Sequence, residues 1–348
     1  MPDKSTLRIR NASLLAGSLD SSRDLREVAM DAKAHLPIAP NLFIVGAPKC
    51  GTTSLYEYLR CHPQIYFPHD EDDYARVKEP NHLCPELRIA DKDAIRDRGA
   101  YMALYQGGQN ALWRGDASTN YLFSENAASN IKSLSPDARI LIMLRPPVEW
   151  MHSYHSELVR HHHEDILDFD EAVAACTDRR NGCRIPPKSG VPMCLDYLAM
   201  ADFAPQIERY HHAFGRDAVK VILLEDLAGS PEATFRDVLA FLGVNTSFRP
   251  EFLVHNETPR RGRVEEVLRV LYRNPAIKVV AQRSVSRAIR HRLLATARQL
   301  DTRRRFPDPV DERLHEQSAR GIERLAALID RDLRHWQTST QRRRARVI

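Results

Sequence analysis

The chain has 348 residues, enough for one large domain with an extension, and a formal net charge of +5 at pH 7. This small basic excess suits an anionic ligand and does not require nucleic acid as a partner. No run approaches the ~18 apolar residues of a membrane span, and the first forty residues lack a signal peptide's apolar segment. We therefore expect a cytoplasmic protein. Its six cysteines have no C-x-x-C spacing, so we expect no zinc site. Cys176, Cys183 and Cys194 could form one disulfide, but we expect free thiols in a reducing compartment.

Residues 1–38 are polar and weakly periodic, and are predicted to form a flexible arm. The apolar run Leu42–Val45 then predicts a buried strand, and residues 54–60 predict a helix. Between them, the segment GAPKCGTTS (46–54) contains two glycines and a proline. A strand, a glycine loop and a helix N-terminus in this order favour a phosphate-type ligand, because backbone N–H groups converge there.

This glycine loop differs from the P-loop of nucleoside-triphosphate enzymes, in which lysine follows the second glycine. Here Lys49 precedes Gly51 by two residues, and Thr52 and Thr53 follow. An ordinary turn between a strand and a helix is the alternative interpretation. The hydroxyl groups that follow the glycine would also suit Mg²⁺ if a carboxylate ended a neighbouring strand.

The next elements are a short strand over 64–67, an acidic loop over 68–77 and a helix over 91–107. Lys78 and Glu79 follow the short strand, and charged residues at such a position lie at the ligand-binding edge of a parallel sheet. A solvated pair before Pro80 is the alternative. The segment 113–118 is predicted as a strand end that leads into a helix over 124–134.

Ala138–Leu144 is the clearest strand, and it ends in Arg145 followed by two prolines that suit the start of a helix. An arginine at the carboxyl end of a strand can donate two hydrogen bonds to a phosphate group. Ser153, about two helical turns later, could add a hydroxyl donor. A Mg²⁺-dependent kinase would more often have aspartate where Arg145 stands.

The alternation of buried strands and helices predicts an α/β fold, a P-loop-like three-layer sandwich with a central parallel sheet over residues 39–263. A long helix over 195–214 and a helix over 231–242 flank the strand 218–224. Glu225 and Asp226 after this strand favour a Mg²⁺-dependent P-loop nucleotide or small-molecule kinase, unless they only cap the next helix. A basic helical extension follows over 264–337, with its last helix over 321–336, and the tail 338–348 is predicted to be disordered.

The basic helices of residues 277–300 suit either docking onto the domain or peripheral contact with an anionic membrane. A third interpretation is a non-catalytic protein that binds acidic lipids or nucleic acid through these arginines. Residues 260–263 pack three arginines around a glycine, which is typical of a phosphate-binding turn or of a solvated charge run.

Together these motifs resemble the sulfotransferases that use 3′-phosphoadenosine 5′-phosphosulfate (PAPS). The loop 43–54 looks like the family's 5′-phosphosulfate loop, Arg145 with Ser153 like its 3′-phosphate pair, and residues 260–263 like the basic loop that closes over the nucleotide. The resemblance covers about residues 40–263. It implies PAPS as the donor, no metal, and these cofactor-binding residues: Lys49, Cys50, Gly51, Thr52, Thr53, Ser54, Arg145, Ser153, Arg260, Arg261, Gly262 and Arg263.

The resemblance also implies the catalytic residues. Lys78-Glu79-Pro80 is similar to the segment that supplies a glutamate base in carbohydrate-modifying members, which makes Glu79 the expected general base and Lys49 its catalytic partner. Small-molecule members have a histidine after the strand that here ends at Asp116. The absence of a histidine there favours a glycan or glycolipid hydroxyl as acceptor. The substrate-binding residues implied are Lys78, His82 and Asp116.

Overall fold

The computed structural model describes residues 38–89, 94–187, 189, 191–253 and 309–337. From Ala39 onward these residues belong to one compact unit. The predicted flexible arm up to residue 37, the arginine turn 260–263, the basic helices before residue 309 and the tail 338–348 lie outside the described residues.

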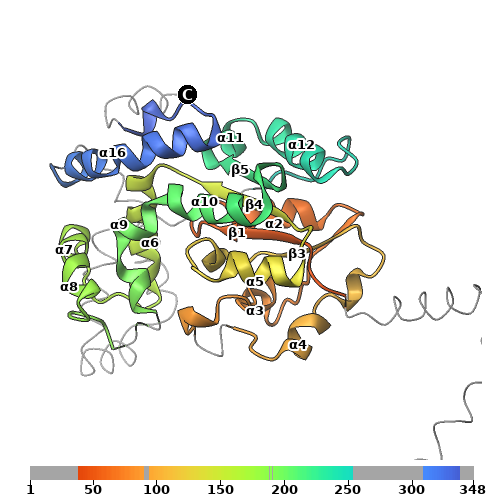
Figure 1. Cartoon of the computed structure of the whole chain (residues 1–348), viewed down its shortest axis with the longest axis horizontal. Coiled ribbons are helices and arrows are strands. Elements are labelled where there is room, and N and C mark those ends of the chain that lie inside the picture. Colours follow the sequence, from red (N-terminus) through yellow and green to blue (C-terminus); the bar gives the residue numbers. More distant parts are fainter. Residues whose placement is uncertain (1–37, 90–93, 188, 190, 254–308, 338–348) are drawn as a thin grey trace, which may run out of the picture. The chain divides into compact units, whose positions relative to one another are not determined.

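A parallel sheet of five strands forms the centre of this unit and confirms the predicted α/β class (Figure 1). Its strand order is β2-β3-β1-β4-β5. Every neighbouring pair of strands is parallel. The strands β1 and β4 are buried almost throughout, which explains why their sequences are continuous apolar runs rather than alternating patterns. The strand bounds are β1 (Leu42–Gly46), β2 (Ile65–Tyr66), β3 (Trp113–Asp116), β4 (Arg139–Leu144) and β5 (Val219–Leu223).

Helices fill the connections between strands. The chain moves across the sheet in one direction from β1 to β2 and in the other from β3 to β4 and β5. Right-handed crossovers therefore place α2 on one face and α5 and α10 on the opposite face, where α5 and α10 are in contact. The helix bounds are α2 (Thr52–Arg60), α3 (Tyr74–Lys78), α4 (Arg98–Ala103), α5 (Ala127–Leu134), α6 (Pro147–Arg160), α7 (Phe169–Ala174), α8 (Cys176–Arg180), α9 (Tyr197–Ala201), α10 (Phe203–Phe214), α11 (Leu224–Gly229), α12 (Pro231–Leu242) and α16 (Pro309–Ile329).

Several helices differ from the sequence-based expectation. The acidic loop contains α3 at its end. Of the helix expected over 91–107, the described residues from 94 onward form only α4 and a short 3₁₀ turn. The helix expected over 195–214 breaks at Asp202 into α9 and α10. In a continuous helix the ring of Pro205 would clash with the carbonyl of Ala201, so the helix restarts at Phe203 and accommodates the proline in its first turn.

The C-terminal helix α16 begins well before Gly321 and ends at Ile329, where Asp330 adopts a left-handed φ of 53°. It contacts both α6 and α10. The bonds include His152 Nε2 to Asp311 Oδ1 at 2.8 Å and Arg324 Nε to Glu208 Oε1 at 2.7 Å. The described end of the chain is thus packed against the helix that follows β4.

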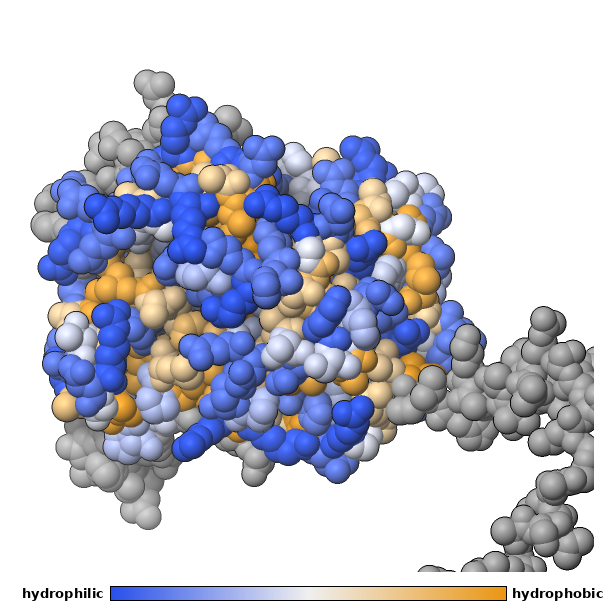
Figure 2. Space-filling view, in the orientation of Figure 1, coloured by the Kyte–Doolittle hydropathy of each residue, from blue (hydrophilic) through white to orange (hydrophobic). Residues whose placement is uncertain are grey.

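Within the described ranges, none of the helices has the length and apolar character needed to cross a bilayer. Hydrophilic residues cover most of the face seen in Figure 2, with hydrophobic residues visible between them in small groups. Large exposed hydrophobic residues such as Leu112, Met193 and Leu253 are ordinary when scattered singly. All six cysteines are free thiols in the structure.

Candidate active site

The loop between β1 and α2 requires glycine at two positions. Gly46 has a φ of 148°, and a Cβ there would lie 2.7 Å from the carbonyl oxygen of Thr119. Gly51 has a φ of 82°, and a Cβ there would lie 2.7 Å from Cδ1 of Leu224. Lys49 also has a positive φ, of 64°, which non-glycine residues adopt infrequently. The backbone is therefore folded closely against its neighbours on both sides of the lysine.

The end of β4 and the start of α6 hold this loop in place. Three consecutive loop residues each make one hydrogen bond to this region: one to β4, one to α6 and one to Arg145, which lies between β4 and α6. The bonds are Ala47 N to Met143 O at 2.7 Å, Trp150 Nε1 to Pro48 O at 2.7 Å and Arg145 Nη1 to Lys49 O at 3.3 Å. The guanidinium group of Arg145, which is predicted to bind the 3′-phosphate, is thus in direct contact with the loop that is predicted to bind the 5′-phosphosulfate.

The N-terminus of α2 faces this loop without a capping side chain. Its N-cap is Gly51, which makes no side-chain hydrogen bond, and the first turn contains no acidic residue. The first N–H groups of a helix have no partner within the helix, and the helix dipole gives this end a partial positive charge. Backbone N–H groups at such a helix N-terminus can bind an anion.

Two cations lie at this site, Lys49 within the loop and Arg145 beside it, and each pairs with a carboxylate of α6. Lys49 Nζ lies 3.1 Å from Glu157 Oε2, and Arg145 Nη2 lies 3.2 Å from Glu149 Oε2. Glu149, Ser153 and Glu157 follow at intervals of four residues, so they share one face of α6. Ser153 therefore lies between the two carboxylates, on the face that is turned to the loop.

The electrostatics of the loop reflect this arrangement. Burial raises the pKa of the Cys50 thiol to about 12, although Arg145 and Lys49 act in the opposite direction, so Cys50 remains a neutral core residue. Partial burial alone would raise the pKa of Glu157, but Lys49 and Arg160 lower it overall. Glu157 is therefore a carboxylate at neutral pH. The Nε atom of Arg145 is buried and has no hydrogen-bond partner among the described residues.

Glu79 lies at the end of α3, and both of its carboxylate oxygens accept hydrogen bonds. Lys78 Nζ donates to Oε1 at 2.6 Å, and the hydroxyl and N–H of Thr119 donate to Oε2 at 2.8 and 3.4 Å. Thr119 is the residue whose carbonyl packs against Gly46, so Glu79 is tied to the start of the glycine loop. Its side chain is 27% exposed, which leaves the carboxylate accessible from outside.

Lys78 is less accessible than expected for a residue that contacts substrate. Its side chain is only 3% exposed, and its ammonium lies 5.7 Å from the centre of the Tyr56 ring. His82 stacks on Tyr101 with ring centres 4.2 Å apart, and its Nδ1 lies 2.8 Å from the carbonyl oxygen of Ile95. Both remain predicted substrate-binding residues, but the contacts described here are with the protein itself.

Asp116 is the predicted substrate-binding residue whose environment departs most from that role. It is 1% exposed and accepts hydrogen bonds from the hydroxyls of Tyr101 and Tyr121 and from the hydroxyl and N–H of Ser118. Burial raises its pKa, and these donors only partly offset that effect. The geometry favours a structural role, in which Asp116 connects the end of β3 to the segments around it.

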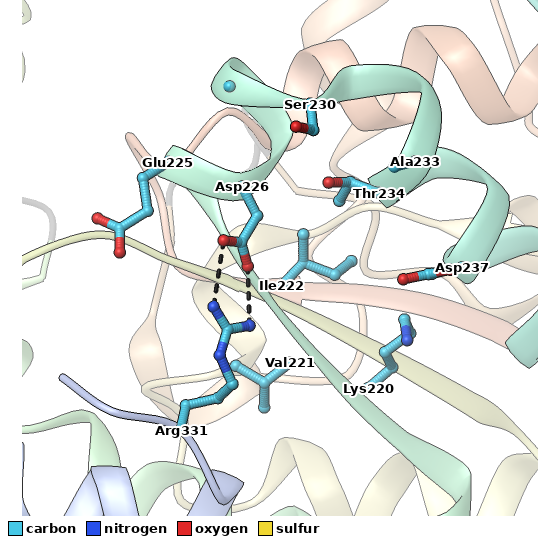
Figure 3. A pocket seen from close by; sticks show the side chains of 11 residues that line it. Lys220, Val221, Ile222, Glu225, Asp226, Ser230, Ala233, Thr234, Asp237 and Arg331 are labelled. Atoms are coloured by element: carbon cyan, nitrogen blue, oxygen red, sulfur yellow. Dashed lines mark hydrogen bonds and ion pairs between the residues drawn. The ribbon is translucent and has the colours of Figure 1, made fainter.

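Glu225 and Asp226, which favoured a Mg²⁺ site in the sequence, lie in the first turn of α11. Figure 3 shows Asp226 facing Arg331, with which it forms two hydrogen bonds of 2.9 and 3.1 Å, and both residues line a cavity of about 430 Å³. Glu225 accepts from the indole N–H of Trp336 at 3.1 Å. Both acids therefore pair with the C-terminal segment, and the N-cap of α11 is Leu223, which makes no side-chain capping hydrogen bond.

Three residues that support the site were not assigned roles from the sequence. Trp150 holds the loop, Thr119 holds Glu79, and Glu157 pairs with Lys49. The intervals of four residues from Glu149 to Ser153 and from Ser153 to Glu157 were a readable signal, because they place both acids on one helix face with Ser153. Nothing local in the sequence indicates the contacts of Trp150 or Thr119. The remaining cofactor-binding candidates, residues 260–263, lie outside the described residues.

A parallel α/β sheet whose first strand ends in a glycine loop, with two cations and a helix N-terminus at that loop, has the architecture of the P-loop-related class. Residues 40–184 match the model of the sulfotransferase family. A sulfotransferase from Alicyclobacillus acidocaldarius has a similar solved structure, with 32% sequence identity, a TM-score of 0.62 and coverage of 86% of this chain and 100% of that chain. The chain belongs to the sulfotransferase family.

Curated relatives are more distant. Carbohydrate sulfotransferase 15 of Homo sapiens is 24% identical over 262 residues, covering 60% of this chain and 45% of that protein. The bifunctional heparan sulfate N-deacetylase/N-sulfotransferase 4 of Mus musculus is 25% identical over 213 residues, covering 60% of this chain and 23% of that protein. The chain thus spans less than half the length of these relatives.

Proposed function

We propose that this protein transfers the sulfuryl group of PAPS to a hydroxyl group of a carbohydrate-type acceptor, a polysaccharide, glycolipid or glycosylated metabolite, and releases 3′-phosphoadenosine 5′-phosphate (PAP). The observation that carries the proposal is the 3.3 Å contact between the Arg145 guanidinium and the Lys49 carbonyl, which brings both candidate phosphate-binding groups to one loop. Family membership supports PAPS as donor. The names of the curated relatives support a glycan acceptor.

The residues present fit a nucleotide with phosphate groups at two ends. The uncapped N-terminus of α2 and Lys49 would hold the 5′-phosphosulfate, as anions bind helix N-termini. Arg145 would hold the 3′-phosphate, since its buried Nε has no partner among the described residues and its fork can bind two phosphate oxygens. Ser153 lies on the loop-facing side of α6 beside it.

The donor supplies a sulfuryl group on a phosphate leaving group. In the proposed step, a bond forms between the acceptor oxygen and sulfur while the bond from sulfur to the bridging phosphate oxygen breaks. Glu79 takes the hydroxyl proton on Oε1, because this oxygen accepts from Lys78 alone among the described residues and keeps a lone pair, whereas Oε2 accepts from both the hydroxyl and the N–H of Thr119. Lys49 stabilises the negative charge that develops on the leaving phosphate. This chemistry uses no metal ion.

The organisation of the remaining chain is part of the same proposal. Residues 39–263 would form the PAPS-binding domain, and residues 264–337 would form a helical extension that includes α16. The contacts of α16 with α6 support docking of this extension onto the domain. A cytoplasmic location and peripheral contact of the basic helices with an anionic membrane remain predictions.

The test is transfer of labelled sulfate from PAPS to glycan fractions of a crude cell extract. The wild-type protein should label a glycan fraction, and Glu79→Gln should abolish labelling while PAP binding stays nearly intact. Glu71→Gln, in an exposed glutamate of the loop before α3, is the matched control and should transfer normally. Full activity of Glu79→Gln would refute the assignment of the base.

A further inference from the structure

The catalytic lysine of the proposed site already has an anionic partner from the protein. Lys49 Nζ lies 3.1 Å from Glu157 Oε2, and the two side chains are only 15% and 26% exposed. Glu157 comes from α6, on the face that also carries Ser153. A lysine that must stabilise a leaving phosphate is therefore held by a carboxylate in this structure.

Glu157 has other cationic or polar partners besides the lysine. Arg160 Nη2 lies 2.5 Å from its Oε2, and His161 Nε2 lies 3.3 Å from its Oε1. Arg160 is the last residue of α6 and His161 follows it directly, so each lies about one helical turn from Glu157. Both residues therefore stay near Glu157 when the conformation of the loop changes. If Lys49 moves to another anion, the carboxylate keeps a charged partner. Exchange of the lysine between Glu157 and a phosphate group therefore leaves no buried charge unpaired.

We propose that Glu157 is a positioning residue that competes with the donor's 5′-phosphosulfate for Lys49, so that donor binding requires the lysine to change partner. This inference rests on the proposed function. It assigns Glu157 an effect on donor affinity that acts through Lys49, and no direct contact with the substrate.

Two consequences follow from the charges. Removing the carboxylate leaves Lys49 available before the donor arrives, so Glu157→Gln should bind PAP more tightly. A partly buried ion pair contributes more than a fully exposed one, so we expect a gain of roughly threefold to tenfold. The same substitution in a Lys49→Ala background should change PAP affinity by less than about twofold, because the competing pair no longer exists.

The experiment measures PAP affinity by calorimetry for the wild type, Glu157→Gln, Lys49→Ala and the double variant. Glu171→Gln is the matched control. Glu171 lies on α7 and pairs with Arg184 at 2.6 Å, so this substitution also removes a paired carboxylate but should leave PAP affinity unchanged. Glu157→Asp, which shortens the side chain by one methylene, serves if the glutamine variant does not fold and should give a smaller gain. With PAPS and an acceptor, Glu157→Gln should lower KM for PAPS.

The outcomes separate this inference from the proposed function. If wild-type protein binds no PAP, the proposed function fails and this inference fails with it. If wild-type protein binds PAP but Glu157→Gln binds it no more tightly, only the inference is overturned. An equal gain in the presence and absence of Lys49 would also overturn it, since Glu157 would then act on the donor through its charge alone.

Discussion

Substituting Asp116 distinguishes a structural role from the substrate-binding role that the sequence predicted. Its carboxylate is 1% exposed and accepts four hydrogen bonds. Asp116→Ala removes the acceptor and leaves buried donors on Tyr101, Tyr121 and Ser118 without a partner. We therefore expect loss of stability rather than a selective loss of substrate binding.

The size of the expected loss in the free energy of unfolding follows from these contacts. The donors lie 2.8 Å (Tyr101 Oη), 3.0 Å (Tyr121 Oη), 2.6 Å (Ser118 Oγ) and 2.9 Å (Ser118 N) from the carboxylate. Each buried donor without an acceptor costs about 1–3 kcal/mol. Burial raises the pKa of Asp116, so its removal also relieves a desolvation cost, and the hydroxyls can rotate toward other partners. We expect Asp116→Ala to lower the free energy of unfolding by about 3–5 kcal/mol.

Urea unfolding at pH 7, followed by tryptophan fluorescence, measures this loss. Asp137→Ala, at an exposed aspartate before β4, is the matched control and should stay within about 0.5 kcal/mol of wild type. If Asp116→Ala unfolded at the wild-type urea concentration but had lost activity, Asp116 would be a substrate ligand and the structural argument would be wrong.

Three further predictions concern the loop. Gly51→Ala places a Cβ at a φ of 82° and against Leu224, so thermal unfolding should show a loss of about 1–3 kcal/mol, and wild-type stability would contradict the strain argument. Lys49→Ala should lower turnover by roughly 10²-fold or more in a labelled-PAPS assay, whereas unchanged turnover would remove the lysine from the chemistry. The lowered pKa of Glu157 means that its pairing stabilises the fold above the ordinary value of 4.5 and that this stability is lost as pH falls through the lower folded value. The stability difference between wild type and Glu157→Gln, from urea unfolding at pH 7 and pH 3, should therefore shrink toward acid, and a constant difference would contradict it.

Much of the fold could be predicted because its signals are local. The strands β1, β4 and β5 are short apolar runs, α6 and α12 begin at prolines, and Gly243 ends α12 with a left-handed φ of 65°. The meeting of Arg145 with the glycine loop also followed, since the carboxyl ends of parallel strands share one edge of the sheet.

The remaining features depend on contacts between distant segments. The pairing of Lys49 with Glu157 spans 108 positions and exists only because α6 packs beside the loop. The burial of Asp116 depends on tyrosines from two other segments, so the same strand-end acid could equally have faced a ligand. The break before α10 was readable from Pro205, but the amphipathic pattern on both sides of it favoured one helix.

The most direct test of the central claim is calorimetry of PAP and ATP, each with and without Mg²⁺, on the wild type and on Arg145→Ala. Arg334→Ala is the matched control, because Arg334 is 86% exposed and pairs with Asp332 at 2.5 Å. We predict PAP binding that is indifferent to Mg²⁺, weakened at least about tenfold by Arg145→Ala and unchanged by the control. Binding of ATP that strengthens with Mg²⁺, or PAP affinity that survives the loss of Arg145, would contradict it.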